Sequence, residues 1–78
     1  MTVWYLDNED CSGVFSTREK AIESFENCAE RCDWVVLEHQ SEGWGDVFIY
    51  AWRNFDGGTW STDSVAIVSY VLDEDNGI

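Results

Sequence analysis

The sequence predicts a small α+β protein, in which an antiparallel sheet with the element order β-β-α-β-β-β carries one amphipathic helix packed on one face. Three observations lead to this prediction. β-branched and aromatic stretches lie on both sides of a single segment with helical apolar spacing. The connections are short and rich in turn residues, which favours antiparallel pairing. The 78 residues, of which 45% are hydrophobic, suffice for one core. We therefore expect one domain over residues 1–78, with a frayed acidic tail at residues 73–78.

The N-terminal segment predicts a β-hairpin. Residues 2–6 are β-branched and aromatic, and the polar run at residues 7–10 that follows them is typical of a turn. Residues 13–15 (Gly-Val-Phe) then form a short return strand.

A helix is predicted over residues 17–32. Ser16 and Glu19 have the spacing of a capping box, in which each side chain binds the backbone amide of the other residue. We expect Ile22 and Phe25 to be buried, because apolar residues recur at three- and four-residue steps at Ala21, Ile22, Phe25, Ala29 and Cys32.

Three further strands are predicted at residues 34–38, 47–53 and 59 or 60 to 72. Loops rich in residues that tolerate positive φ separate them, at residues 41–46 and 54–58. In the strand at 47–53, alternate residues point to opposite faces, and both faces are apolar. Since one helix covers only one face, the other could present an aromatic patch to a partner or a second copy, or the rings could simply fill the core.

The junction at residues 13–21 (Gly-Val-Phe-Ser-Thr-Arg-Glu-Lys-Ala) resembles a strand-to-helix junction that recurs in small phage and bacterial proteins of unknown function. In size, acidity and lack of a catalytic motif, the chain is similar to small acidic phage-encoded inhibitors of host defence. These include anti-CRISPR and anti-restriction proteins, several of which mimic DNA. The resemblance implies an inhibitor that acts by protein–protein interaction in the cytoplasm of a host cell.

The charge of the chain restricts its partners. Sixteen acidic residues against four basic ones give a formal net charge of −12. Direct binding of nucleic acid or of an anionic membrane requires clustered Lys and Arg, which this chain lacks. A cationic partner is favoured instead. Three cysteines, an odd number, fit a reducing compartment, and no signal-like or membrane-spanning apolar run is present, so we expect a cytoplasmic protein.

The helix carries a row of glutamates at i, i+4, i+7 and i+11, which places them on the face opposite the apolar stripe. We predict that a host nucleic-acid-binding protein contacts this row with its basic groove. Acidic turns and one tryptophan between glycines complete the predicted surface, which consists of Glu19, Glu23, Glu26, Glu30, Asp7, Glu9, Asp10, Glu42, Trp44 and Asp46. The alternatives are a solvated acidic face, a homodimer formed through an aromatic sheet face, and a small-ligand binder that uses stacked tryptophans.

Catalysis and metal binding find little support. The chain has one histidine and no catalytic or phosphate-binding motif, so we expect neither enzyme activity nor a cofactor. Cys11, Cys28, Cys32 and His39 are ligand types that zinc accepts, but their spacing is not that of a zinc knuckle. The acidic run at residues 7–10 lacks the spaced ligands of a calcium loop. We therefore predict no metal site and three reduced, structural thiols, with Cys32 on the buried stripe.

Overall fold

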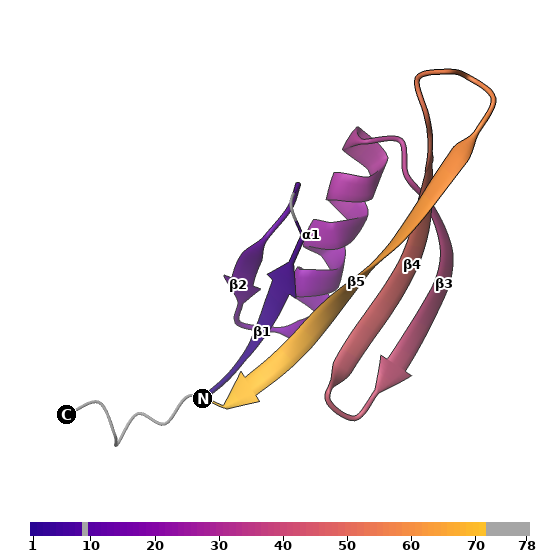
Figure 1. Cartoon of the computed structure of the whole chain (residues 1–78). Helices are drawn as coiled ribbons and strands as arrows, with labels where there is room; N and C mark the ends of the chain where they lie inside the picture. Colours follow the sequence, from indigo (N-terminus) through magenta and orange to yellow (C-terminus); the bar gives the residue numbers. More distant parts are fainter. Residues whose placement is uncertain (9, 72–78) are drawn as a thin grey trace.

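The computed structural model describes residues 1–8 and 10–71, and it confirms the α+β prediction. Its elements are β1 (Thr2–Asp7), β2 (Gly13–Phe15), α1 (Arg18–Arg31), β3 (Val35–Glu42), β4 (Gly45–Arg53) and β5 (Trp60–Val71). The five strands form one antiparallel sheet in the order β2-β1-β5-β4-β3, and α1 lies against one face of it (Figure 1). The tail predicted at residues 73–78 lies outside the described residues, as do Glu9 and residue 72.

The long strand β5 joins the two parts of the sheet. Its C-terminal half pairs with β1, from Thr2 opposite Val71 to Asp7 opposite Ala66. Its N-terminal part pairs with β4, from Arg53 opposite Trp60 onward. Twelve residues of β5 therefore connect the N-terminal hairpin to the β3–β4 hairpin, as Figure 1 shows.

The helix begins one residue later than the capping box predicts. Thr17, with extended backbone angles, is the N-cap, and its hydroxyl accepts a hydrogen bond from the Lys20 amide at 3.1 Å. Ser16 is not the cap. Ser16 stands three positions before the Glu19 amide, and Thr17 stands three positions before the Lys20 amide. Local spacing therefore does not decide which of the two hydroxyls caps the helix. The Thr17 cap leaves Arg18 at the first helical position, where its guanidinium reaches Asp46 of β4.

The buried stripe of α1 consists of Ala21, Phe25, Cys28 and Ala29. Phe25 is fully buried as predicted, and its ring stacks on Phe48 with centroids 4.6 Å apart. Ile22 is only partly buried at the edge of the core. The prediction that Cys32 is buried is wrong, because the helix ends at Arg31 and Cys32 is its exposed C-cap.

The β3–β4 hairpin is tighter than predicted. Strand β3 begins at Val35 and continues to Glu42, so only Gly43 and Trp44 connect it to β4. A side chain at Gly45 would overlap the Ile67 carbonyl oxygen, which explains why β4 begins with glycine. Strand β3 forms one edge of the sheet and is exposed along its whole length.

The two faces of the sheet differ. Phe48 and Tyr50 point toward α1, where they join a buried cluster with Leu6, Ala21, Phe25, Val65 and Ile67. These rings are therefore core and form no exposed aromatic patch. The opposite, open face has Val47 and Ile49 on β4, Tyr70 on β5 and Tyr5 on β1. Within the described part of the chain, no helix has the length and apolarity needed to cross a membrane.

Candidate cation-binding surfaces

The four helix glutamates form an exposed row. Glu19, Glu23, Glu26 and Glu30 all lie on the solvent side of α1, and no ion pair within the described residues involves any of them. The nearby ammonium group of Lys20 lies 3.4 Å from the Ser16 hydroxyl instead. At ~1.5 Å per residue, the eleven-residue span is about 16 Å long. Basic side chains of the helix lie near part of the row, since Arg18 interacts electrostatically with Glu19, and Lys20 and Arg31 line the same surface hollow as Glu23. Within the described residues, however, none of them is close enough to a glutamate of the row to form an ion pair.

Asp46 is not part of the acidic surface that we predicted. Only 1% of its side chain is exposed, because it occupies the core-facing register of β4 together with Phe48 and Tyr50. Arg18 donates to both carboxylate oxygens, at 2.9 Å from Nε and 2.7 Å from Nη2. His39 and Ser41 add hydrogen bonds of 2.8 Å each. The hydrogen bonds from Arg18 hold the pKa of Asp46 well below its usual range. Asp46 thus anchors the start of α1 to β3 and β4.

The remaining predicted residues fall in two places. Glu42 is exposed at the end of β3, and Trp44 is half-exposed at the tip of the β3–β4 hairpin. Asp7 and Asp10 are exposed beside the turn that follows β1. Glu9 lies outside the described residues. The predicted set therefore does not form one continuous site.

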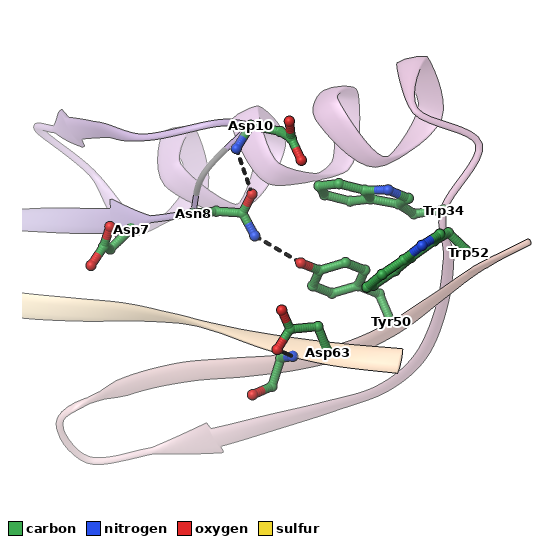
Figure 2. A pocket seen from close by; sticks show the side chains of 8 residues that line it. Asp7, Asn8, Asp10, Trp34, Tyr50, Trp52 and Asp63 are labelled. Atoms are coloured by element: carbon green, nitrogen blue, oxygen red, sulfur yellow. Dashed lines mark hydrogen bonds between the residues drawn. The ribbon is translucent and has the colours of Figure 1, made fainter. Parts of the chain in front are cut away.

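Asp7 and Asp10 instead belong to a cleft that the sequence did not reveal as a unit (Figure 2). It has a volume of about 520 Å³, and it lies between the turn after β1, Trp34 in the connection from α1 to β3, and strands β4 and β5. Its lining combines carboxylates, aromatic rings and small polar groups, contributed by Asp7, Asn8, Asp10, Trp34, Tyr50, Trp52, Asp63 and Ser64.

The aromatic rings of the cleft are fixed by one another. Trp34 stacks on Tyr50 with centroids 4.4 Å apart and planes 25° apart, and Trp52 lies 5.8 Å from Tyr50. The hydroxyl oxygen of Tyr50 accepts a 2.8 Å hydrogen bond from the Asn8 side chain. Asn8 in turn accepts a 2.9 Å hydrogen bond from the Asp10 amide. Asn8 therefore ties the turn to the buried ring (Figure 2).

The cleft is electrostatically negative. The carboxylates of Asp10 and Asp63 line it, the Asp7 carboxylate is turned toward the open face of the sheet, and the described lining residues include no Lys or Arg. Burial raises the pKa of Tyr50 above its ordinary value, and the charges of Asp63 and Asp10 act in the same direction. The hydroxyl of Tyr50 therefore stays protonated and neutral at neutral pH, and the negative charge of the cleft comes from its carboxylates.

No protein family, curated protein or solved structure matches this chain. What the protein binds must therefore be inferred from its own side chains.

Sequence reasoning did not single out Asp63, Asn8 or Ser64. A signal for Asp63 was present, because it alternates with Val65 and Ile67 on the core-facing side of β5, directly opposite Tyr50. In a strand, every second side chain points to the same face, so a carboxylate two positions before buried residues points to the core side. Because burial of a charge is costly, such a carboxylate is expected at the edge of the core or in a pocket. Asn8 and Ser64 carried no comparable signal.

The cysteines and the histidine do not converge on one site. The thiols of Cys11, Cys28 and Cys32 lie close enough to influence one another electrostatically, whereas His39 lies on β3, hydrogen-bonded to Asp46 and stacked on Phe48. Burial raises the pKa of Cys11 to about 12, so this thiol is protonated at neutral pH. In residues 1–8 and 10–71, no group of three His, Cys, Asp or Glu side chains is arranged to hold a metal ion.

Proposed function

We propose that this protein is a non-enzymatic acidic binding protein that occupies a basic nucleic-acid-binding surface of a partner protein and excludes DNA or RNA from it. The observation that carries the proposal is the exposed row of four glutamates on α1, none of which is neutralised by an ion pair within the described residues. Unneutralised carboxylates on a rigid helix attract a cationic surface without first having to break pairs of their own.

The charge spacing of the row is of the same order as that of DNA phosphates, but wider. Four charges over about 16 Å give one charge per ~4–6 Å, whereas one strand of a DNA duplex carries one per ~3.4 Å of axis. The helix row alone is therefore a sparser array than a DNA strand. Exposed acids outside the row, such as Asp10 and Glu42, add charge to the same molecule. Long Lys and Arg side chains in a groove built for phosphates can adjust to this spacing.

The scaffold keeps the row in place. Phe25 anchors the opposite side of α1 in the core, and the Arg18–Asp46 pair fixes its first turn. A fixed array loses little conformational entropy on binding, which favours affinity for a groove of matching charge.

The test uses a triple variant and a control with the same charge. Glu23→Gln, Glu26→Gln and Glu30→Gln remove three charges from the row. Asp33→Asn, Glu38→Gln and Asp56→Asn remove three exposed charges elsewhere. Partners are captured from lysate at low salt and identified, and the affinity of a captured partner is then measured for each protein at two salt concentrations, with and without duplex DNA.

The row variant is expected to associate more slowly and with a shallower salt dependence than the control variant. DNA should compete with the wild-type protein for the partner. Equal salt slopes for the two variants, or a ternary complex that retains DNA, would contradict the proposal.

A second candidate, an interaction module that homodimerises, is favoured by the open sheet face. Val14 and Tyr70 are more than half exposed there, and Tyr5 and Tyr70 meet edge to face at 6.4 Å. Burial of this face in a dimer would be driven by the hydrophobic effect and would strengthen with salt, because salt screens the repulsion between two acidic copies. Sedimentation at low and high salt separates this candidate from the first.

A further inference from the structure

The geometry points to a specific ligand class for the cleft in Figure 2: we propose that it binds the guanidinium group of an arginine side chain presented by a peptide or protein. This inference does not rest on the proposed function, because none of the helix glutamates lines the cleft. A single guanidinium could bind there whether or not the helix row contacts a partner.

The first step of the argument is the charge of the ligand. Asp10 and Asp63 bring two carboxylates to one concave site that has no basic residue among its described lining residues, whereas the Asp7 side chain points to the open face of the sheet. Their mutual repulsion is relieved when a cation enters between them. The partly buried rings of Trp34 and Trp52 line the cleft beside the buried ring of Tyr50, and the faces of indole rings attract cations. Both features of the lining therefore favour a cationic ligand.

The second step is the choice among cations. Asp10 on the turn and Asp63 on β5 place carboxylates on two sides of the rings (Figure 2). Together they offer several acceptor oxygens. A guanidinium has five donors in a plane, so it can pair with carboxylates while it lies against an aromatic ring. A quaternary ammonium has no donor and would leave the carboxylates unpaired. A lysine ammonium is more strongly hydrated and lacks the planar surface.

The third step is preorganisation. Asn8 holds the Tyr50 hydroxyl and the Asp10 amide in one chain of hydrogen bonds. Trp34 is held by stacking on Tyr50 and by its amide, which donates to the Ala29 carbonyl at 2.8 Å. The site is thus formed before the ligand arrives, so little of the interaction energy is lost in ordering it.

The test titrates ¹⁵N-labelled protein with three capped tripeptides, Gly-X-Gly, in which X is arginine, lysine or citrulline. Citrulline keeps the shape of arginine but has no charge. The indole signals of Trp34 and Trp52, assigned with Trp→Phe variants, report on the cleft. We expect saturable shifts of these two signals with arginine, at least about twofold weaker binding of lysine, and no saturation with citrulline.

Two variants and a matched control complete the test. Asp63→Asn and Asp10→Asn should each weaken arginine binding about two- to fivefold, the range for partly exposed charge pairs. Glu26→Gln removes the same charge from the far side of α1 and should leave binding unchanged. The two cleft variants are tested separately, so that one remains informative if the other perturbs the fold.

Several results would overturn the inference. These are the absence of saturable shifts at Trp34 and Trp52, equal binding of citrulline, and tighter binding of lysine or tetramethylammonium than of arginine. A Glu26→Gln variant that weakens binding as much as Asp63→Asn would show that the shifts reflect net charge and not the cleft. None of these results bears on competition with DNA for a partner, so the two proposals fail independently.

Discussion

Replacing Asp46 by Asn tests how the helix is joined to the sheet. The carboxylate is almost fully buried and accepts hydrogen bonds from Arg18, His39 and Ser41. Asn keeps the size of the side chain but loses the charge, and its amide nitrogen cannot accept a hydrogen bond from Arg18. The substitution therefore removes the electrostatic tie while it creates no cavity.

The size of the effect follows from burial. Removing one partner of a fully buried ion pair costs about 3–5 kcal/mol, because the other charge is left without compensation. Here the Arg18 side chain is 43% exposed, so water can solvate part of its charge after the substitution. We therefore expect Asp46→Asn to lower the free energy of unfolding by about 2–4 kcal/mol. A domain of this size has a total of only ~4–12 kcal/mol.

Thermal and urea unfolding, followed by tryptophan fluorescence, measure this loss. It corresponds to a fall in melting temperature of roughly 8–30 °C for a domain of this length. Glu26→Gln, which neutralises an exposed carboxylate on α1, is the control and should change stability by less than about 0.5 kcal/mol. If Asp46→Asn melts within about 3 °C of Glu26→Gln, Asp46 does not tie the helix to the sheet.

The stability difference between the wild type and Asp46→Asn should depend on pH. Because the pKa of Asp46 is lowered in the folded state, its contribution to stability is complete above the ordinary value of 3.8 and is lost as the pH falls through the lower folded value. The stability difference between the wild type and Asp46→Asn should therefore be constant from pH 7 to about pH 5 and shrink toward pH 2. A difference that is unchanged at pH 2 would contradict the assigned ionisation.

Three further predictions concern the core, the tight hairpin and the thiols. Phe25→Ala should cost about 3–5 kcal/mol in chemical denaturation, because a buried ring stacked on Phe48 is removed, and a melt within a few degrees of wild type would contradict the packing. Gly45→Ala should cost at least about 1–3 kcal/mol, since its methyl group meets the Ile67 carbonyl, whereas Gly43→Ala, with open space around it, is the control. Cys11 should react with iodoacetamide more than tenfold slower than a free thiol, because its pKa is raised to about 12, while Cys11→Ser and added chelator should leave the melt nearly unchanged.

Local patterns determined the elements of this fold. The three- and four-residue spacing around Phe25 depends only on the geometry of a helix, and the alternation around Phe48 depends only on that of a strand. Both patterns were therefore visible in the sequence, and they placed the helix and all five strands within a few residues. The exposed positions of Glu19, Glu23, Glu26 and Glu30 follow from the same periodicity.

Tertiary contacts decided what local patterns could not. Asp46 was predicted on the surface as part of an acidic turn, but hydrogen bonds from Arg18, which is 28 positions away, and from His39 and Ser41 make its burial tolerable. The cleft depends likewise on the pairing of Asp63 with Tyr50 and on the Asn8 hydrogen bond, across 13 and 42 positions. Such contacts require that β5 pairs with both β1 and β4. A strand's own residues determine which of its faces is apolar, but the strands beside it and the helix above it determine what each face meets.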